Sequence, residues 1–276
     1  MTTSLRPART EAKPDERVNA APAAVAIEEP TASPPRSPSS FRRGNTVPEE
    51  AVAAMFDDIA PVYDRMNTLM TLGSDRRWRR MAVDLTALKP GESVIDVACG
   101  TGKLSIALAE RVGPFGRVLG VDLSSGMIEL ARASNRDLVQ LDFAVGNALS
   151  LPAGDGEFDA ATIAFGLRNL ADFEAGFREL RRVVRPGGRV VCLELSMPRP
   201  RAWGRVYHAL FRRSAPLLGA MFRRRHAYGY LPESLQGFPQ PDQLAVTMRR
   251  AGLVDVGFRR LALGAVAIHR GRVPTG

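Results

Sequence analysis

Two acidic residues and a glycine-rich turn have the types and spacing that a nucleotide-binding site requires. Asp96 ends an apolar run rich in β-branched residues, and Gly100 and Gly102 lie in the turn that follows. A helical pattern begins at about residue 103, so the segment predicts a strand, a tight turn and a helix. Glycines let a backbone pass close to a ligand, and ligands of parallel α/β sheets bind outside the carboxyl ends of the strands. Residues 96–102 are therefore expected to form the floor of a nucleotide-like pocket.

The kind of nucleotide is indicated by the third glycine position and by a second acidic residue. A dinucleotide-binding turn has the pattern G-x-G-x-x-G, but Ser105 stands at the third position here. Asp122 ends another buried run, 20 residues after Gly102, where a carboxylate can accept hydrogen bonds from both ribose hydroxyls. A strand-end acid before Gly-Thr-Gly resembles the first motif of class I S-adenosylmethionine (SAM) methyltransferases. The resemblance implies SAM as methyl donor, with these residues at its methionine end: Asp96, Gly100, Thr101 and Gly102.

Alternating apolar runs and helical patterns predict an α/β fold with the Rossmann-like, seven-stranded sheet of class I SAM-dependent methyltransferases. Asn147 and Ala148 follow the third strand and are expected at the adenine edge of the pocket. A helix is expected to stop at the Pro-Gly-Gly of 186–188. The last two strands are expected to form a terminal hairpin. The predicted strands are 93–96, 118–122, 141–145, 158–165, 189–195, 254–258 and 264–269.

The chain before this core divides into a tail and a helical region. Residues 1–46 are rich in proline and poor in large apolar residues, which predicts a disordered tail. Its acidic residues argue against a transit peptide. Residues 47–276 are predicted to be the methyltransferase domain. A helix from about residue 48, limited by Pro61, and a second from about residue 76 are expected to cover the sheet, to form an N-terminal helical lid over the SAM pocket, or both.

The positive charge is concentrated in one segment. The chain has a net charge of +9, and residues 199–225 contain eight arginines and no acidic residue. We expect residues 199–240 to be a basic amphipathic cap insertion, whose apolar face packs on the core or whose residues 199–225 contact an anionic membrane. Phosphate-backbone binding is a third interpretation, but no nucleic acid partner is predicted. No uninterrupted apolar run of about 18 residues occurs. No metal site is expected. The sequence also predicts a cytoplasmic protein, peripheral at the inner face of the membrane.

Four stretches indicate a family more specific than the class I SAM methyltransferases as a whole. They are 55–64, Phe165-Gly-Leu-Arg-Asn169, 228–234 and 264–271. With them the chain resembles the quinone C-methyltransferases of menaquinone and ubiquinone biosynthesis (the UbiE/MenG/COQ5 family) over residues 49–272. The resemblance implies methylation of a polyprenyl hydroquinone, with demethylmenaquinol preferred and a methoxy-benzoquinol left open. The chain departs from the family pattern at Lys103, Leu149 and Met197.

The resemblance also implies residues for the reaction. Arg168 and Asn169 follow the fourth strand and are expected to hold the quinol oxygen, although an ion pair that braces the turn is an alternative for Arg168. Tyr63 and Asp64 are second candidates, and Asp64 would either accept a proton or cap a helix. Two other functions stay open, an RNA-modifying methyltransferase and a SAM-binding scaffold without catalysis. A homodimer is also left open.

Overall fold

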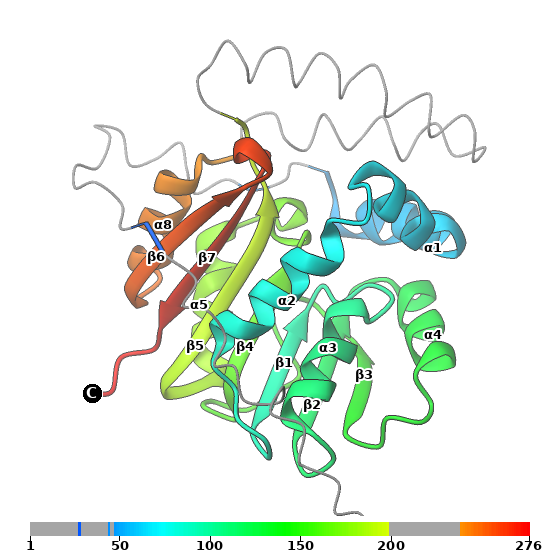
Figure 1. The fold of residues 1–276 in the computed structure, drawn as a ribbon, viewed down its shortest axis with the longest axis horizontal. Helices are drawn as coiled ribbons and strands as arrows, with labels where there is room; N and C mark the ends of the chain where they lie inside the picture. The colour runs from blue at the N-terminus through cyan, green and yellow to red at the C-terminus, as the bar shows by residue number, and fades with distance from the viewer. Residues whose placement is uncertain (1–26, 29–43, 45–46, 199–237) are drawn as a thin grey trace, which may run out of the picture.

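Seven strands form one mixed sheet in the computed structural model, which describes residues 27–28, 44, 47–198 and 238–276 (Figure 1). The strand order is β3-β2-β1-β4-β5-β7-β6, and β7 runs antiparallel to both of its neighbours. The chain reverses its direction of winding between β1 and β4, the point at which such sheets bind ligands. The strands are β1 Ser93–Val97, β2 Arg117–Asp122, β3 Leu141–Val145, β4 Phe158–Ala164, β5 Val184–Leu195, β6 Val254–Leu261 and β7 Val266–Arg272.

Helices cover both faces of this sheet. α2 (Asp75–Thr86), α3 (Lys103–Val112) and α4 (Ser125–Ser134) pack on one face, and α5 (Phe173–Val183) and α8 (Pro241–Arg250) pack on the other (Figure 1). Neighbouring residues of β1 show the division, because Val94 belongs to the core with Leu108 of α3 and Ile95 to the core with Phe177 of α5. Burial on both faces explains why the strands are continuous apolar runs. The predicted α/β class and terminal hairpin are confirmed.

The N-terminal helix differs from its prediction. α1 (Glu49–Met70) is one helix that continues through Pro61, so the expectation that this proline limits the helix was wrong. Pro61 lacks the N–H that would bond to the carbonyl four residues earlier. Contacts on both sides of it compensate, since Asp57 and Asp64 each accept hydrogen bonds from loops of the sheet. Tertiary packing therefore overrides the local signal.

The start of β5 was also predicted wrongly. α5 ends at Val183, and β5 begins at Val184, five residues before the predicted strand. Val184 pairs with Phe158 of β4 across an irregular register, so the Pro-Gly-Gly segment is included in the strand. Pairing with a distant strand set this boundary, and local turn residues did not indicate it.

Parts of the predicted tail and cap lie outside the described residues. Of 1–46, only 27, 28 and 44 are described: the backbone of Glu28 exchanges two hydrogen bonds with Phe258 of β6, and Gly44 donates to the Ala171 carbonyl. Residues 199–237 of the predicted cap are outside the description. Among the described helices, none is long and apolar enough to cross a membrane.

Gly102 is the residue of the turn at which both the backbone and a neighbouring side chain require glycine. Its φ is +82°, and a Cβ would lie 2.7 Å from the ring of Phe143. Gly91 has a φ of +86° but nothing within 4 Å of a built Cβ. We expect Gly102→Ala to lower the free energy of unfolding by about 2–4 kcal/mol, and Gly91→Ala by only about 1–2 kcal/mol, because Gly91 lacks the clash. Urea denaturation of both variants checks this, and equal losses would contradict the role of the Phe143 contact.

Candidate active site

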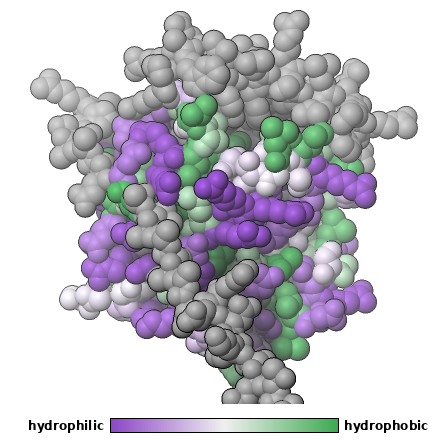
Figure 2. Space-filling view, in the orientation of Figure 1, coloured by the Kyte–Doolittle hydropathy of each residue, from purple (hydrophilic) through white to green (hydrophobic). Residues whose placement is uncertain are grey.

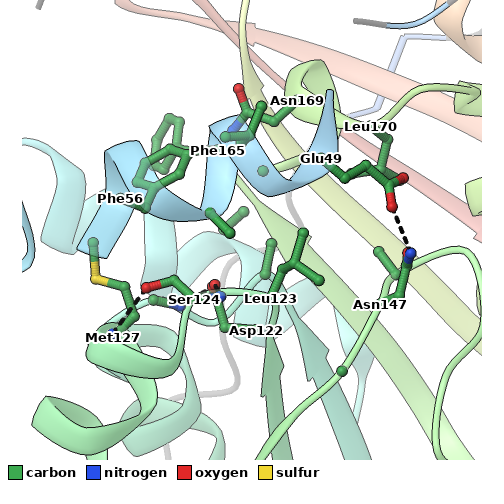
Figure 3. Close-up of a pocket in the computed structure, with 18 of the residues that line it drawn as sticks. Glu49, Phe56, Asp122, Leu123, Ser124, Met127, Asn147, Phe165, Asn169 and Leu170 are labelled. Atoms are coloured by element: carbon green, nitrogen blue, oxygen red, sulfur yellow. Dashed lines mark hydrogen bonds between the residues drawn. The ribbon is translucent and has the colours of Figure 1, made fainter. Parts of the chain in front are cut away.

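A pocket opens where the turns after β1, β2 and β3 meet the end of β4 (Figure 3). It contains predicted residues of the SAM site, and α1 forms its upper wall. Two of its residues, Ala98 after β1 and Phe165 after β4, have left-handed backbone conformations that are uncommon outside glycine. Such strain collects at functional sites. The predicted residues that line this pocket are Gly100, Asp122, Asn147, Ala148, Tyr63 and Asn169.

Asp122 ends β2 at the floor of the pocket. Its Oδ2 accepts the N–H of Gly100 at 2.8 Å, and its Oδ1 accepts the N–H of Ser124 at 3.0 Å. Burial raises the pKa of the Asp122 carboxyl, and these backbone donors oppose the rise. A carboxylate has about four acceptor positions, so the backbone donors leave acceptor capacity for a ligand. These acceptor positions fit a ribose, whose two neighbouring hydroxyls can donate hydrogen bonds.

Three carboxylates fasten α1 over the pocket. Glu49 accepts the side-chain amide of Asn147 at 2.6 Å, as Figure 3 shows. Asp57 accepts the Ser124 hydroxyl and, at 2.9 Å, the N–H of Gly126. Asp64 accepts the Thr101 hydroxyl at 2.8 Å and lies 3.6 Å from the ammonium of Lys103. One face of α1 is thus bonded to the loops after β1, β2 and β3, which is the arrangement of a lid.

A smaller hollow lies beside the Gly-Thr-Gly turn. It is lined by Asp96, Thr101 and Lys103, and it shares Tyr63 and Gly100 with the larger pocket. The Asp96 carboxylate is buried and accepts the hydroxyls of Ser105 at 2.6 Å and Thr162 at 2.7 Å. Asp96 therefore joins β1 to β4 and to α3 beneath the turn. Gly102 lines neither space in the described structure; it supports the turn.

The stability of the protein should depend on the charge of Asp96. Burial raises the pKa of this carboxyl from 3.8 to about 6. The folded state then binds the proton more tightly than the unfolded state, so stability falls as the pH rises from about 4 to about 6 and is level above. The expected loss is on the order of 2–3 kcal/mol.

Asp96→Asn removes this titration and leaves a group of the same size. The quantity to follow is the difference in the free energy of unfolding, wild type minus variant. We expect this difference to fall by about 2–3 kcal/mol between pH 4 and pH 7. Urea titrations at several pH values measure it. A difference that stays constant over this range would contradict the raised pKa.

A second, mainly apolar pocket adjoins the first. It encloses about 340 Å³ between α1, α2 and the end of β5, and Tyr63 and Phe165 line both pockets. Trp78 of α2 packs against Phe165 with ring centres 6.4 Å apart. Arg79 lies with its guanidinium 5.6 Å from the Phe165 ring centre and donates to Asp75 at 3.0 Å. Together with Tyr63, these rings make one wall of the pocket aromatic.

Arg168 lines the second pocket from within the short 3-10 helix η2 (Leu167–Asn169). It is buried, and its Nη1 donates to Glu194 Oε1 at 2.7 Å and to the carbonyl of Phe165. Glu194 also accepts the backbone N–H of Arg168 and of Leu195. The ion pair that braces the turn is therefore present, while the same side chain reaches the pocket wall.

The structure distributes the predicted catalytic residues over different walls. Tyr63 lines both pockets, Arg168 the second pocket and Asn169 the first. Asp64 lines the small hollow and is engaged by Thr101 and Lys103. Sequence reasoning missed two of the lid carboxylates, Glu49 and Asp57, and the packing of Trp78 against Phe165. A signal existed for the carboxylates, because these three acids are spaced by eight and seven residues and share a helical face: Glu49, Asp57 and Asp64.

Comparison with known proteins found relatives that align with most of this chain. The demethylmenaquinone methyltransferase of Thermus thermophilus is 46% identical over 223 residues, which are 80% of this chain and all of that protein. The corresponding protein of Desulfitobacterium hafniense is 41% identical, over 79% of this chain and 88% of its own length. A relative from Geobacter sulfurreducens, named ubiquinone/menaquinone biosynthesis C-methyltransferase UbiE, is 39% identical over 80% of this chain and 88% of its own.

Solved structures show the same fold. A SAM-dependent methyltransferase from Thermotoga maritima has a TM-score of 0.57 at 19% identity, over 80% of this chain and 98% of that one. Another from Aquifex aeolicus has a TM-score of 0.53 at 19% identity, over 71% of this chain and 89% of that one. The sheet, the pocket at its switch point and these relatives identify a class I methyltransferase. Since residues 45–273 also match the family as a whole, this chain belongs to the ubiE/COQ5 methyltransferase family.

Proposed function

We propose that this enzyme transfers the methyl group of SAM to a ring carbon of a polyprenyl hydroquinone, and that its acceptor is demethylmenaquinol. The observation that supports this most directly is the apolar pocket that shares Tyr63 and Phe165 with the nucleoside-type pocket. A donor and a flat aromatic acceptor bound in these two spaces would meet at the shared wall. The names of the relatives from Thermus and Desulfitobacterium support demethylmenaquinol, a naphthoquinol, as the acceptor.

The residues of the first pocket would hold SAM. Asp122 would accept the ribose hydroxyls, and Asn147 and Ala148 would contact the adenine. The Gly-Thr-Gly turn and Asp96 would lie at the methionine end. When bound, SAM supplies a methyl group attached to a positively charged sulfur. The carboxylates on α1 hold this helix over the pocket, where it would exclude water from the bound SAM.

The residues of the second pocket would act on the acceptor. A hydroquinone carbon becomes nucleophilic when the neighbouring hydroxyl loses its proton to water. This carbon would bond to the methyl group as the bond from that group to sulfur breaks, S-adenosylhomocysteine would leave, and the carbon would then lose its own hydrogen as a proton to water. Arg168 is a poor base because its guanidinium stays protonated, but it can stabilise the phenolate. We propose that Tyr63 also contacts this oxygen. Asn169 would lie on the side of the acceptor that faces SAM. Asp64 is engaged by Thr101 and Lys103, so we assign it to positioning the lid.

The location of the enzyme follows from the acceptor. A polyprenyl tail stays in the bilayer, so the enzyme would work at the inner surface of the membrane. The basic segment 199–225 would contact anionic lipid there, and it lies outside the described residues.

The test is methyl transfer from labelled SAM to chemically reduced demethylmenaquinone. The oxidised quinone, a methoxy-benzoquinol with the same tail and bulk RNA serve as comparisons. We expect label in the naphthoquinol alone. Equal labelling of the benzoquinol would support the broader specificity in the name of the Geobacter relative. Label in RNA, or none in any acceptor while SAM still binds, would overturn the proposal.

A further inference from the structure

The mouth of the second pocket has two leucines that project into solvent. Leu72, in the turn between α1 and α2, is 88% exposed, and Leu263, in η3 (Ala262–Gly264), is 81% exposed. Both line the pocket. Among the large apolar side chains that are exposed in the described structure, Leu69 also lies next to this mouth. Apolar patches are visible along the upper edge of the described surface in Figure 2, near the level at which Figure 1 places η3.

The backbone presents these leucines at a conformational cost. Leu72 has a φ of +49° and Leu263 a φ of +55°, in the left-handed region that leucine rarely adopts. The two residues are far apart in the sequence and reach the same mouth from different elements. Neither is buried, so core packing does not explain either one. Strained residues of this kind gather at functional surfaces.

The surroundings of the mouth are basic. A shallow groove beside it is lined by Leu69, Leu72, Arg65 and Arg76, and also by the ion pair of Lys103 with Asp64. The chain also leaves the sheet here, because Leu195 at the end of β5 lines the pocket and the arginine-rich segment begins four residues later. Apolar tips surrounded by cations are complementary to a bilayer surface with anionic headgroups.

We propose that Leu72 and Leu263 form a lip that inserts into an anionic bilayer and places the mouth of the second pocket against the lipid. This inference rests on the proposed function, since it gives a polyprenyl tail a route from the bilayer to the aromatic wall. Arg65 and Arg76 bind the headgroups beside the lip. The ring of the acceptor then enters the pocket while its tail remains in the lipid.

Vesicle co-sedimentation tests the lip without requiring methyl transfer. The full chain is mixed with vesicles of phosphatidylcholine alone, or of phosphatidylcholine with phosphatidylglycerol. We expect the wild type to bind the anionic vesicles at least about tenfold more tightly, and Leu72→Ser/Leu263→Ser to lose about tenfold or more of that affinity. Serine has a Cβ, as leucine does, so the substitutions leave the steric cost of the left-handed backbone at both positions about unchanged.

Phe115→Ser is the matched control. Phe115 is 92% exposed in the turn between α3 and β2, at the opposite end of the strands from the lip. We expect it to bind anionic vesicles as the wild type does. An equal loss in both variants would show nonspecific adsorption through exposed apolar side chains and would overturn the proposal. A wild type that binds neither kind of vesicle would also overturn it.

The Tm and the SAM affinity of the double variant complete the test of the lip. If the leucines were covered by residues 199–237 of this chain, the double variant would show a lower Tm and unchanged vesicle binding, and the proposal would be wrong. SAM binding by the double variant serves as a folding check, and we expect it to match the wild type. Vesicle binding that depends on the lip, in an enzyme that methylates no quinol, would contradict the proposed function and leave the lipid contact standing.

Discussion

Replacing Arg168 with methionine is expected to abolish methyl transfer and to lower the free energy of unfolding by about 3–5 kcal/mol. The loss of stability follows from Glu194, which is 1% exposed and pairs with Arg168 at 2.7 Å. Without the guanidinium, its negative charge stays buried and uncompensated. Urea denaturation measures the stability, and transfer of labelled methyl groups measures the activity.

A second variant separates bracing from catalysis. Arg168→Met/Glu194→Gln removes both charges, so most of the lost stability should return, because a buried ion pair contributes little net stability over a neutral replacement. If Arg168 holds the acceptor oxygen, the double variant stays inactive although it is folded and binds SAM. Restored turnover in the double variant would show that Arg168 only braces η2. The intact SAM pocket is the internal control, because Arg168 does not line it.

The bounds of several strands could be predicted from the apolar pattern. Leu141–Val145 was predicted to the residue, and the start of β1 and the end of β2 also agree with the prediction. Apolar runs that end in a polar residue leave little choice of boundary there. β7 was predicted to begin at residue 264 but begins at Val266, because Leu263 takes a left-handed conformation within a 3-10 turn. Nothing in a leucine indicates that conformation.

The nucleotide site was also predictable because its residues follow successive strands. Asp122, Asn147 and Gly100 are far apart in sequence, but parallel strands bring their carboxyl ends to one edge. The contacts of the lid were not predictable in the same way. Glu49 and Asp57 resemble ordinary solvent-facing acids of a helix, and only the packing of α1 against the sheet shows which loops they bind.

Asp122→Ala is expected to raise the dissociation constant for SAM by about 100-fold or more. Two hydrogen bonds from hydroxyls to a charged acceptor contribute about 1.5–3 kcal/mol each, and about 1.4 kcal/mol is tenfold in affinity. Isothermal titration calorimetry with S-adenosylhomocysteine measures the change. Asp142→Ala is the matched control, because Asp142 is an exposed acid on the neighbouring strand β3 and lines no described pocket of the nucleoside site.

The alanine variant alone does not prove a ribose contact, since Asp122 also accepts the N–H groups of Gly100 and Ser124 and so shapes both turns. A 2′-deoxyribose analogue of S-adenosylhomocysteine resolves this. If Asp122 binds the ribose, the wild type should prefer the natural ligand to the analogue by about tenfold or more, and the variant should bind both equally. A preference that persists in Asp122→Ala would place the hydroxyl contact elsewhere. Asp122 would then support the loops, and the affinity it provides would come from the shape of the pocket.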